Sequence, residues 1–317
     1  MTDSTHTPLG PGAEFDHIRA LLDLWGPVAQ GIGDDAAILS VPAGQRLVVS
    51  TDSTVDAVHF RRDWMSMRDV GSRGATAALS DLAAMGAVAD SVLVSLVVPD
   101  AWRKHLSQFA DGIRQSTQLA GARIVGGNIS SGTTFSCTFT VLGHAQRPVR
   151  RSGGSPGDVL CVTGTLGGPG AALASLQRRD KPHPDALERF LHPSARLAEG
   201  LWLAQNGAAA LIDISDGLAA DARHLGAASG LHAYIDPALV PHYPFASAEE
   251  ALVGGEEYEL LVALPEARAA DVIARFNDTF ALRLTRVGVL EPAAESDRSN
   301  STSRVELGGG HDHFSSR

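Results

Sequence analysis

Residues 69–99, DVGSRGATAALSDLAAMGAVADSVLVSLVVP, join two different periodicities in one uninterrupted stretch. The first part, residues 69–87, is rich in alanine with apolar residues at helical spacing, and the last part, residues 91–99, is a β-branched run of strand length. A second run of this kind, RLVVSTD at 46–52, precedes the alanine-rich segment. TTFSCTFTVLGHA at 133–145 alternates in the way that is typical of a half-buried antiparallel strand. The first half of the chain is therefore expected to mix helices and strands.

A cluster of turn residues, RRSGGSPGD at 150–158, separates this half from the next. Beyond it we expect a strand at VLCVTG, helices at AALASLQRR and PSARLAEGLWLAQNG, the mixed segment ALIDISDGLAADARHLGAASG, the strand HAYID and the segment GGEEYELLVALP. The chain is about twice the usual domain length, which favours two domains. We therefore predict a mixed α/β architecture in two halves, with a disordered tail at 1–12 and domains at 13–149 and 150–317.

The composition is that of a globular protein outside the membrane. Of the 317 residues, 44% are apolar and 20% are charged, and no apolar stretch approaches the roughly 18 residues that a membrane span needs. The segment MTDSTHTPLGPGAEF lacks the features of a signal peptide, and the two cysteines, Cys137 and Cys161, lie far apart and outside any metal-binding spacing. We therefore expect a soluble cytoplasmic protein with no membrane partner and with both thiols in its core.

The net charge of −10 limits what the chain can bind. A nucleic-acid surface would need a basic patch, so we expect no nucleic-acid partner. Only two lysines are present, Lys104 and Lys181. An anionic substrate would therefore have to be held by arginines, backbone amides or metal ions.

Carboxylates recur beside small residues along the chain. Asp34 and Asp35 lie in GIGDDAAIL at 31–39, and further acids in similar settings are Asp52, Asp81, Asp213, Asp216, Glu256 and Glu257. If these segments converge, two carboxylates about 5 Å apart repel each other by roughly 3 kcal/mol at an effective dielectric constant near 20, so protons or cations must intervene. Oxygen ligands without cysteine or paired histidine favour Mg²⁺ or Mn²⁺ over Zn²⁺. Because magnesium also binds substrate phosphates, nucleotide chemistry is the natural use of such a cluster.

Each of these residues also has an ordinary structural interpretation. Asp34 and Asp35 can belong to a single solvated turn, and Asp213 can cap the helix that follows it. Asp81 is harder to explain in this way, because an unpaired carboxylate inside an apolar helix is costly. For His59 in DAVHF, the ordinary interpretation is a structural histidine, which is commoner than a substrate contact. GIGDDA approaches the dinucleotide-binding fingerprint, but no clear strand precedes it and no helix follows, and the sequence contains no P-loop motif.

The motifs GIGDDAAIL, STDSTVDAVHF, ALSDLAAMGA, TGTLG, DISDGL, GGEEYEL and DHF occur in an order and spacing that resemble the thiamine-monophosphate kinase family, from about residue 14 to the end. Its wider superfamily includes aminoimidazole-ribonucleotide synthetase, selenophosphate synthetase and a hydrogenase-maturation enzyme, which share the fold and the ATP site. The resemblance implies an N-terminal α/β domain whose mixed sheet pairs across a homodimer, and a C-terminal α+β domain. It also implies that ATP lies between the acidic loops together with several Mg²⁺ ions.

The resemblance implies roles for individual residues, position by position. The implied metal ligands are Asp35, Ser50, Thr51, Asp52, Asp81, Asn128, Asp213 and Asp216. The implied ATP contacts are Gly127, Asn128, Arg151 and Ser215. The implied contacts with thiamine monophosphate are His59, Glu256 and His311. Asp81 and Arg151 are the residues expected to carry the catalytic step.

The implied reaction is direct, in-line transfer of the γ-phosphoryl group of ATP to the phosphate of thiamine monophosphate, which gives thiamine diphosphate and ADP. The attacking oxygen is largely ionised at neutral pH, because the second pKa of a phosphate monoester is about 6. No general base is then required. Magnesium ions and Arg151 would neutralise charge, and positioning would supply the rest of the rate acceleration.

Two positions depart from the pattern of this family. Asn128 stands where a metal-binding aspartate is usual, so we expect weaker occupancy of that ion. His311 stands where Trp or Tyr usually precedes the closing motif, so we expect weaker stacking on thiamine. Two rivals stay open: another ATP-dependent enzyme of the superfamily, acting on an aminoimidazole precursor, and a noncatalytic nucleotide-binding or metal-binding homologue. The motifs GGEEYEL and DHF favour the kinase over the first rival.

Overall fold

The computed structural model describes residues 13–32 and 36–293 of the chain. Its contacts divide the chain into two compact units. The first unit takes residues 1–82 and 87–147, and the second takes residues 83–86 and 148–317. Each unit has its own sheet and is described by itself.

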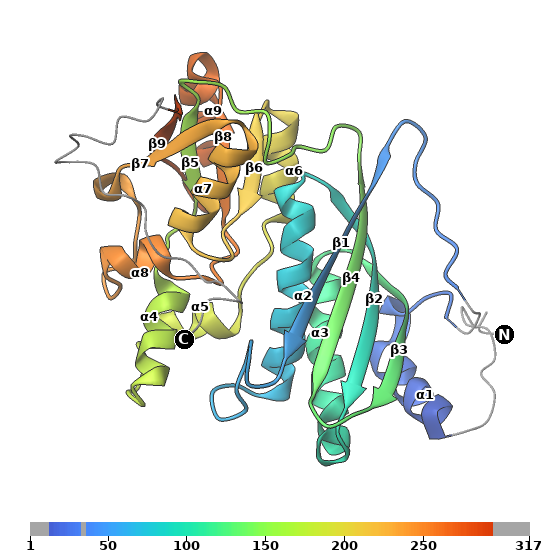
Figure 1. Ribbon diagram of the computed structural model, residues 1–317. Coiled ribbons are helices and arrows are strands. Elements are labelled where there is room, and N and C mark those ends of the chain that lie inside the picture. Colours follow the sequence, from blue (N-terminus) through green and yellow to red (C-terminus); the bar gives the residue numbers. More distant parts are fainter. Residues whose placement is uncertain (1–12, 33–35, 294–317) are drawn as a thin grey trace. The chain divides into compact units, whose positions relative to one another are not determined.

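The first unit is built around one mixed sheet. Its elements are α1 (Ala13–Trp25), η1 (Gly26–Val28), β1 (Arg46–Val55), α2 (Met67–Ala84), β2 (Val88–Val98), η2 (Asp100–His105), α3 (Leu106–Leu119), β3 (Arg123–Ser131) and β4 (Ser136–Ala145). The strand order is β1-β4-β2-β3 (Figure 1). Strands β2 and β3 are parallel, whereas β4 is antiparallel to both β1 and β2. The mixed sheet that the family resemblance implies is therefore confirmed.

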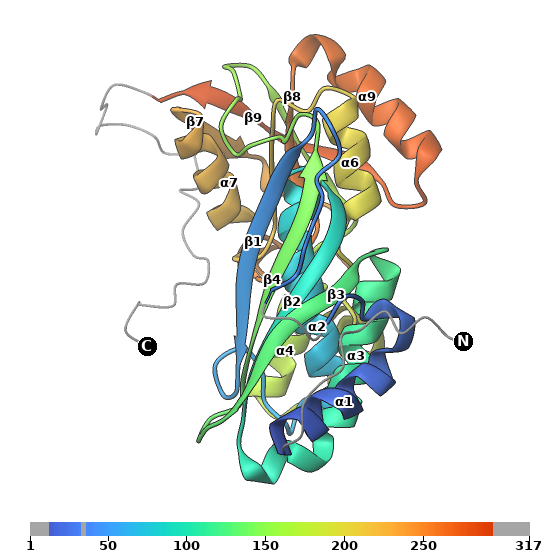
Figure 2. The same cartoon turned by 90° about the vertical axis from the view of Figure 1, so that its right-hand side faces the viewer.

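The helix predicted at 69–87 is α2, which lies with α3 on one face of this sheet (Figure 1). The two helices approach closely because both carry glycine at the crossing. A Cβ atom on Gly112 would lie 2.0 Å from the carbonyl oxygen of Arg68, and one on Gly71 would lie 2.2 Å from that of Phe109. Any larger side chain would force the helices apart. Helix α1 contacts α3 and β3, at the β3 edge of the sheet (Figure 2).

The alternation predicted at 133–145 is confirmed in β4, whose residues are buried and half-buried in turn. The buried residues face α2 and α3, and the half-buried residues lie on the opposite face. We call the part of that face around four of them the open face: Thr138, Thr140, Leu142 and His144. Directly paired residues share a face of a sheet. The open face therefore also includes the β1 partners of these residues, which are Ser53, Thr51, Val49 and Leu47.

The second unit is built around a five-stranded antiparallel sheet. Its elements are β5 (Val159–Thr163), α4 (Gly168–Gln177), α5 (Pro184–Leu191), α6 (Leu197–Gln205), β6 (Ala210–Asp213), α7 (Leu218–Ala228), β7 (Leu231–Ile235), η3 (Pro237–Leu239), α8 (Ala248–Val253), β8 (Leu260–Leu264), α9 (Glu266–Thr279) and β9 (Leu284–Pro292). The strand order is β6-β8-β5-β9-β7. The α+β organisation expected for this half is confirmed.

Helices cover both faces of this second sheet. One face packs against α7 and α8 and the other against α6 and α9, so the central strands β5 and β8 are buried along their whole length. Cys161 in β5 is fully buried, and burial raises the pKa of its thiol to about 12. Cys137 in β4 is equally buried, and burial raises the pKa of its thiol as well. Both cysteines are therefore the core residues that the sequence predicts.

The helices of the second unit differ from the prediction in extent. The helix expected at 193–207 begins only at Leu197, because the backbone of Arg196 is not helical (φ −85°, ψ 50°) and its side chain is bonded to Glu259. Helices α5, α8 and α9 are not among the elements predicted from the sequence. Among the helices within the described ranges, none is long and apolar enough to cross a membrane.

Candidate functional site

Three side chains predicted to bind metal lie on the helix-facing side of the first sheet. Ser50 Oγ donates a hydrogen bond to Asp81 Oδ2 at 2.5 Å, which joins β1 to α2. Asp52 follows Ser50 by two residues and therefore points to the same side. The pKa of the Cys137 thiol is raised mainly by burial of the thiol, and the negative charge of Asp52 raises it further. Asp52 Oδ1 also accepts the backbone N–H of Ser53 at 2.7 Å. The first unit thus brings a hydroxyl group and two carboxylates to one side of the sheet.

Thr51 lies between these residues in the sequence, but its side chain is on the open face. Its hydroxyl group donates to the carbonyl oxygen of Phe139 at 3.2 Å and lies 3.3 Å from the hydroxyl group of Thr140. Strand alternation is the physical reason, because successive side chains point to opposite faces. The Thr51 side chain therefore does not join the group formed by Ser50 and Asp81.

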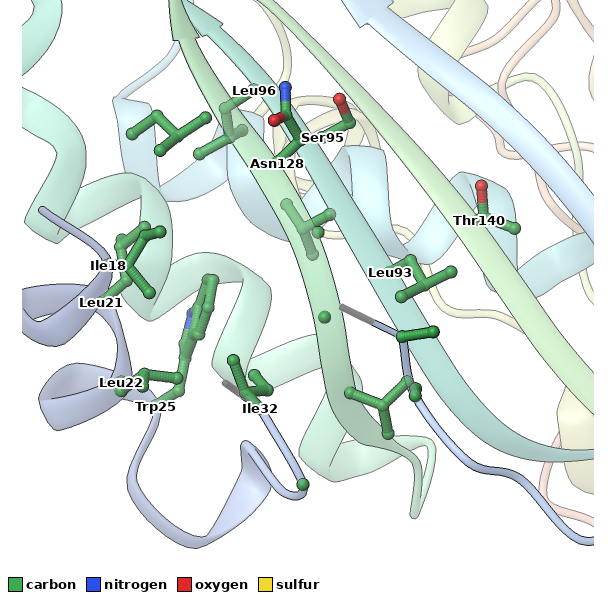
Figure 3. A pocket seen from close by; sticks show the side chains of 18 of the residues that line it. Ile18, Leu21, Leu22, Trp25, Ile32, Leu93, Ser95, Leu96, Asn128 and Thr140 are labelled. Atoms are coloured by element: carbon green, nitrogen blue, oxygen red, sulfur yellow. The ribbon is translucent and has the colours of Figure 1, made fainter. Parts of the chain in front are cut away.

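A cavity of about 790 Å³ opens on the open face of the first sheet (Figure 3). Its walls come from α1, from the described residues on either side of positions 33–35, and from β2, β3 and β4. Apolar side chains such as Leu21, Trp25 and Leu93 make up most of the wall, and Asn128 supplies a polar group. Such a lining, apolar with a few placed polar groups, is typical of a small-molecule site.

The predicted ATP contacts Gly127 and Asn128 both line this cavity. Asn128 is paired with Ser95 in β2, and Ser95 is paired with Thr138 in β4, so polar side chains form a row across the sheet. Figure 3 shows Asn128 and Ser95 next to each other at the cavity. At Gly127 a Cβ atom would lie 1.9 Å from the carbonyl oxygen of Val94. Only glycine fits at this position without a shift of the neighbouring strand.

His59 lies just after β1, and local hydrogen bonds determine the orientation of its ring. Its Nδ1 accepts the backbone N–H of Val55 at 3.1 Å, and its own backbone N–H donates to the carbonyl oxygen of Val55 at 3.0 Å. A neutral ring in this arrangement carries its proton on Nε2. The structure thus gives His59 a structural role, and its implied contact with substrate stays a prediction.

In the second unit, the predicted residue Asp213 is the last residue of β6. Ser215 and Asp216 lie in the loop at residues 214–217 between β6 and α7, which we call the acidic loop. One carboxylate oxygen holds this loop: Asp221 Oδ2 accepts the backbone N–H groups of Ser215 and Asp216 at 3.1 Å each and that of Gly217 at 3.2 Å. The helix begins after Gly217. The alternative that Asp213 caps the helix is therefore wrong, because the N-cap position is Gly217. Asp221, in the first turn of the helix, instead binds N–H groups of the loop that precedes it. The acid in the first turn is the sequence signal for this contact.

Negative charge accumulates at this acidic loop. The pKa of Asp221 is raised to about 7. Burial is the largest cause, and the nearby charges of Asp213 and Asp216 add to it, whereas the backbone N–H groups of Asp216 and Ser215 lower the pKa. A hard divalent cation would relieve such repulsion, and the donors are all oxygen atoms, which is the set that magnesium prefers. Within residues 13–32 and 36–293, no three or more His, Cys, Asp or Glu side chains are already arranged around a metal position.

The segment at 254–258, which contains Glu256, is paired with the acidic loop. The N–H of Glu256 donates to the carbonyl oxygen of Ser215 at 2.7 Å, and that of Tyr258 donates to Ile214 at 2.9 Å. In return, the N–H of Ile214 donates to the carbonyl oxygen of Glu259 at 2.7 Å. These bonds extend the β6-β8 ladder beyond the strands. They place the predicted ATP contact Ser215 beside the predicted substrate contact Glu256.

Glu257, which follows Glu256, points into the protein. Its Oε1 accepts the backbone N–H of Gly167, at the start of α4, at 2.5 Å. Burial raises the pKa of Glu257 to about 8, although the N–H of Gly167 and the charge of Arg189 lower it, and Glu259 adds a small increase. Glu257 is therefore part of the protein interior, and Glu256 is the acid of this pair that is partly accessible.

Three further predicted residues are not joined to these groups by any described contact. Arg151 is exposed, and its carbonyl oxygen accepts the hydroxyl group of Ser229 at 3.2 Å. Asp35 and His311 lie outside the described residues. The roles implied for all three stay predictions.

Comparison with known proteins assigns both halves of the chain to one family. Residues 33–145 match the model of the AIR synthase related protein, N-terminal domain, and residues 155–297 match that of its C-terminal domain. The thiamine-monophosphate kinase of Escherichia coli K12 is 38% identical over 268 residues, which cover 80% of each chain. This chain belongs to the thiamine-monophosphate kinase family. The thiamine-monophosphate kinase of Bacillus subtilis is 29% identical over 323 residues, which cover 95% of this chain and 99% of the relative.

Solved structures of the thiamine-monophosphate kinase family agree with this assignment. The enzyme of Stenotrophomonas maltophilia K279a has a TM-score of 0.78 and 30% identity, and the match covers 90% of this chain and 95% of the other. AaThiL complexed with AMPPCP and TMP has a TM-score of 0.75 and 29% identity, with 95% and 97% covered. The hydrogenase maturation protein HypE, at 18% identity, shares the fold alone. The predicted family, fold and enzyme class, a phosphotransferase, are therefore confirmed.

Proposed function

We propose that this protein uses ATP to phosphorylate thiamine monophosphate to thiamine diphosphate. The observation that carries the proposal is the match to AaThiL, whose structure holds AMPPCP and TMP and which aligns with 95% of this chain. AMPPCP is an analogue of ATP, so that relative binds both reactants of the proposed reaction. Two features of this chain's own structure support the proposal: the cavity lined by Gly127 and Asn128, and the contact between the Ser215 and Glu256 loops.

In this reaction the protein has to bring two anionic phosphates together. The acceptor oxygen is already ionised, so the main tasks are positioning and neutralisation of charge. We assign magnesium binding to Ser50, Asp52 and Asp81 in the first unit and, separately, to Asp213 and Asp216 in the second. All five supply oxygen atoms, and the acids beside Asp221 raise its pKa. When bound, Mg²⁺ would neutralise charge on the phosphates. The further assignments are Asp35, Thr51 and Asn128 as additional ligands, Arg151 as a catalytic contact with ATP, and His59 and His311 as substrate contacts.

We place the base of the nucleotide at the cavity of the first sheet. This cavity lies on the face opposite to Ser50, Asp52 and Asp81, so the phosphates would have to extend beyond it to reach magnesium held by those residues. The apolar wall of the cavity, with Trp25 and Leu93, offers a surface for the flat base, and Asn128 can hydrogen-bond to polar atoms of the nucleotide. The close approach of β3 to β2 at Gly127 leaves main-chain groups near the ligand with no side chain in the way.

We also propose that the protein forms a homodimer through the open face. Leu47 and Val49 of β1 lie on this face, next to the half-buried Leu142. Each of the two residues is 53% exposed. Exposed apolar residues side by side on a strand are costly in water and mark an interaction surface. Because the family resemblance implies pairing through the same sheet, a second copy of this chain is the proposed partner.

The variant Val49→Arg is expected to be monomeric, because it places a charge at the centre of the proposed contact. Light scattering after size-exclusion chromatography would show the molar mass fall from that of two chains to that of one. Leu119→Arg is the matched control, since Leu119 at the end of α3 is 82% exposed and does not belong to the open face. A dimer that persists in Val49→Arg would contradict the proposed interface.

We further infer that the protein works in the cytoplasm. Cys137 and Cys161 are both free thiols in the protein core. Unpaired buried cysteines are typical of proteins in a reducing compartment.

The proposed activity is tested with purified protein, ATP, Mg²⁺ and thiamine monophosphate, with the products separated by chromatography. We expect thiamine diphosphate and ADP in equal amounts, and no thiamine diphosphate when thiamine replaces its monophosphate, because thiamine lacks the acceptor phosphate. Turnover of ATP only with an aminoimidazole precursor would favour the rival enzyme. Binding of ATP without turnover of either substrate would favour the noncatalytic homologue.

A further inference from the structure

The loop at residues 254–258 has a backbone conformation that its residues do not favour. Glu256 has a φ of 63° and Tyr258 a φ of 51°, so two residues other than glycine adopt left-handed conformations within three positions. Such a conformation is costly for a residue other than glycine, and it persists only when the surrounding contacts impose it. The loop carries the proposed substrate contact Glu256, so the contacts that impose its shape bear on function.

Four charged side chains, which we call the ion cluster, lie against this loop: the half-buried Arg189 and Arg196 and the buried Glu257 and Glu259. Arg189 in α5 binds both the loop and the residue that follows it. One Nη2 atom donates to the carbonyl oxygen of Glu257 at 3.2 Å and to Glu259 Oε1 at 3.0 Å. Arg196 binds Glu259 from the other side, with Nε 2.8 Å from Oε2. Arg189 is thus the member of the cluster that bonds to the backbone of the loop itself.

Stability alone is a poor explanation for the ion cluster. Arg189 and Arg196 are only 16% and 18% exposed, and Glu259 is 1% exposed. Removing such charges from water offsets most of their mutual attraction, and apolar side chains in their place are often as stable. Within the described residues, Glu257 Oε2 and Arg189 Nε also have no hydrogen-bond partner, which adds a cost. A cluster with these costs is better explained by the single geometry that it imposes on the loop.

We propose that Arg189 is a positioning residue for thiamine monophosphate: by joining the Glu257 carbonyl to the Glu259 carboxylate, it fixes the left-handed turn that presents Glu256. This inference rests on the proposed function. The acidic loop has a separate anchor in Asp221, which binds three of its N–H groups. Loss of Arg189 should therefore disturb binding of thiamine monophosphate and largely spare binding of ATP.

The kinetic test compares Arg189→Met and Arg189→Lys with the wild type. We expect KM for thiamine monophosphate to rise at least about tenfold in both variants, since a displacement of about 1 Å in a binding group has effects of this size, and KM for ATP to change less than about threefold. Lysine keeps the charge but not the planar guanidinium group, so Arg189→Lys should restore little of the affinity for thiamine monophosphate. The control is Arg178→Met, whose exposed arginine pairs with Asp180. Equal changes in both KM values, or none in either, would overturn the proposal.

Hydrogen exchange provides a readout that does not depend on activity. In the protein without substrate, the amides of Glu256 and Tyr258 are expected to exchange at least about tenfold faster in Arg189→Met, while those of Ser215 and Gly217 keep their protection. If the wild type shows no kinase activity but exchange responds in this way, the proposed function fails and the positioning of the loop by Arg189 stands. Unchanged exchange at both amides would overturn the proposal. If Arg189→Met does not fold, Arg189→Lys decides by the same two measurements.

Discussion

Asp81→Ala is expected to lower kcat for thiamine monophosphate phosphorylation by about 1,000-fold or more, with the fold intact. The carboxylate of Asp81 lies on the same side of the first sheet as Ser50 and Asp52 and is bonded to Ser50. Its loss removes one oxygen ligand and one negative charge from the proposed magnesium site, so the phosphates would approach each other with less of their charge neutralised. Alanine is the most favourable residue in the middle of a helix, so α2 should persist. Steady-state kinetics and thermal unfolding would measure the two effects separately.

Two further variants make the result on Asp81 specific. Asp81→Asn keeps the shape and can still accept the bond from Ser50, so loss of turnover in this variant as well would assign the effect to charge. Asp278→Ala makes the same change at an exposed position in α9 and should retain full activity. Turnover near that of the wild type in Asp81→Ala would remove Asp81 from the proposed site.

Asp221→Ala is expected to reduce both stability and activity, because one carboxylate oxygen accepts three backbone N–H groups of the acidic loop. Loss of these three hydrogen bonds should lower the free energy of unfolding by about 2–3 kcal/mol. The loop would then no longer hold Ser215 and Asp216 in position, and a displacement of about 1 Å can lower kcat about 100-fold. Urea unfolding and kinetics at saturating ATP would test the two parts.

The isosteric variant Asp221→Asn separates geometry from charge at this position. Its amide oxygen can accept the same N–H groups, although more weakly than a carboxylate. We therefore expect Asp221→Asn to recover most of the stability and a large part of the activity. If Asp221→Ala lost stability but kept kcat within about threefold of the wild type, the acidic loop would not need this anchor for catalysis.

The regular elements show where prediction from sequence succeeds. The alternation of residues 133–145 and the alanine-rich helix at 69–87 depend on periodicities that any local window contains, and both are present as β4 and α2. Residues 193–207 show the limit of this approach. Their helical pattern continues through Arg196, but the backbone of Arg196 is not helical and its side chain is bonded to Glu259.

In the candidate site, too, the sequence identifies individual residues, whereas only the structure shows their contacts. Ser50, Asp81, Ser215 and Glu256 could be named because the motifs that contain them resemble those of the thiamine-monophosphate kinase family. Their partners could not be named in this way. The bond between Ser50 and Asp81 joins positions 31 apart, and the alternation of β1 places Thr51 on the face opposite to Ser50. Asp221 and Arg189 carry no motif of their own, so their importance is visible only from what they contact.

The amino-acid order alone determined the strand and helix periods, the family, and the set of oxygen donors available for phosphate chemistry. These follow from local spacing and from side-chain type, which do not depend on the path of the chain. Only the folded chain decided which acid holds the acidic loop, and that Arg189 and Glu259 impose the left-handed turn at Glu256. Those outcomes depend on hydrogen bonds between residues that are distant in sequence. Such bonds form only when folding brings the two residues together, and they contribute to stability because folding shields them from water.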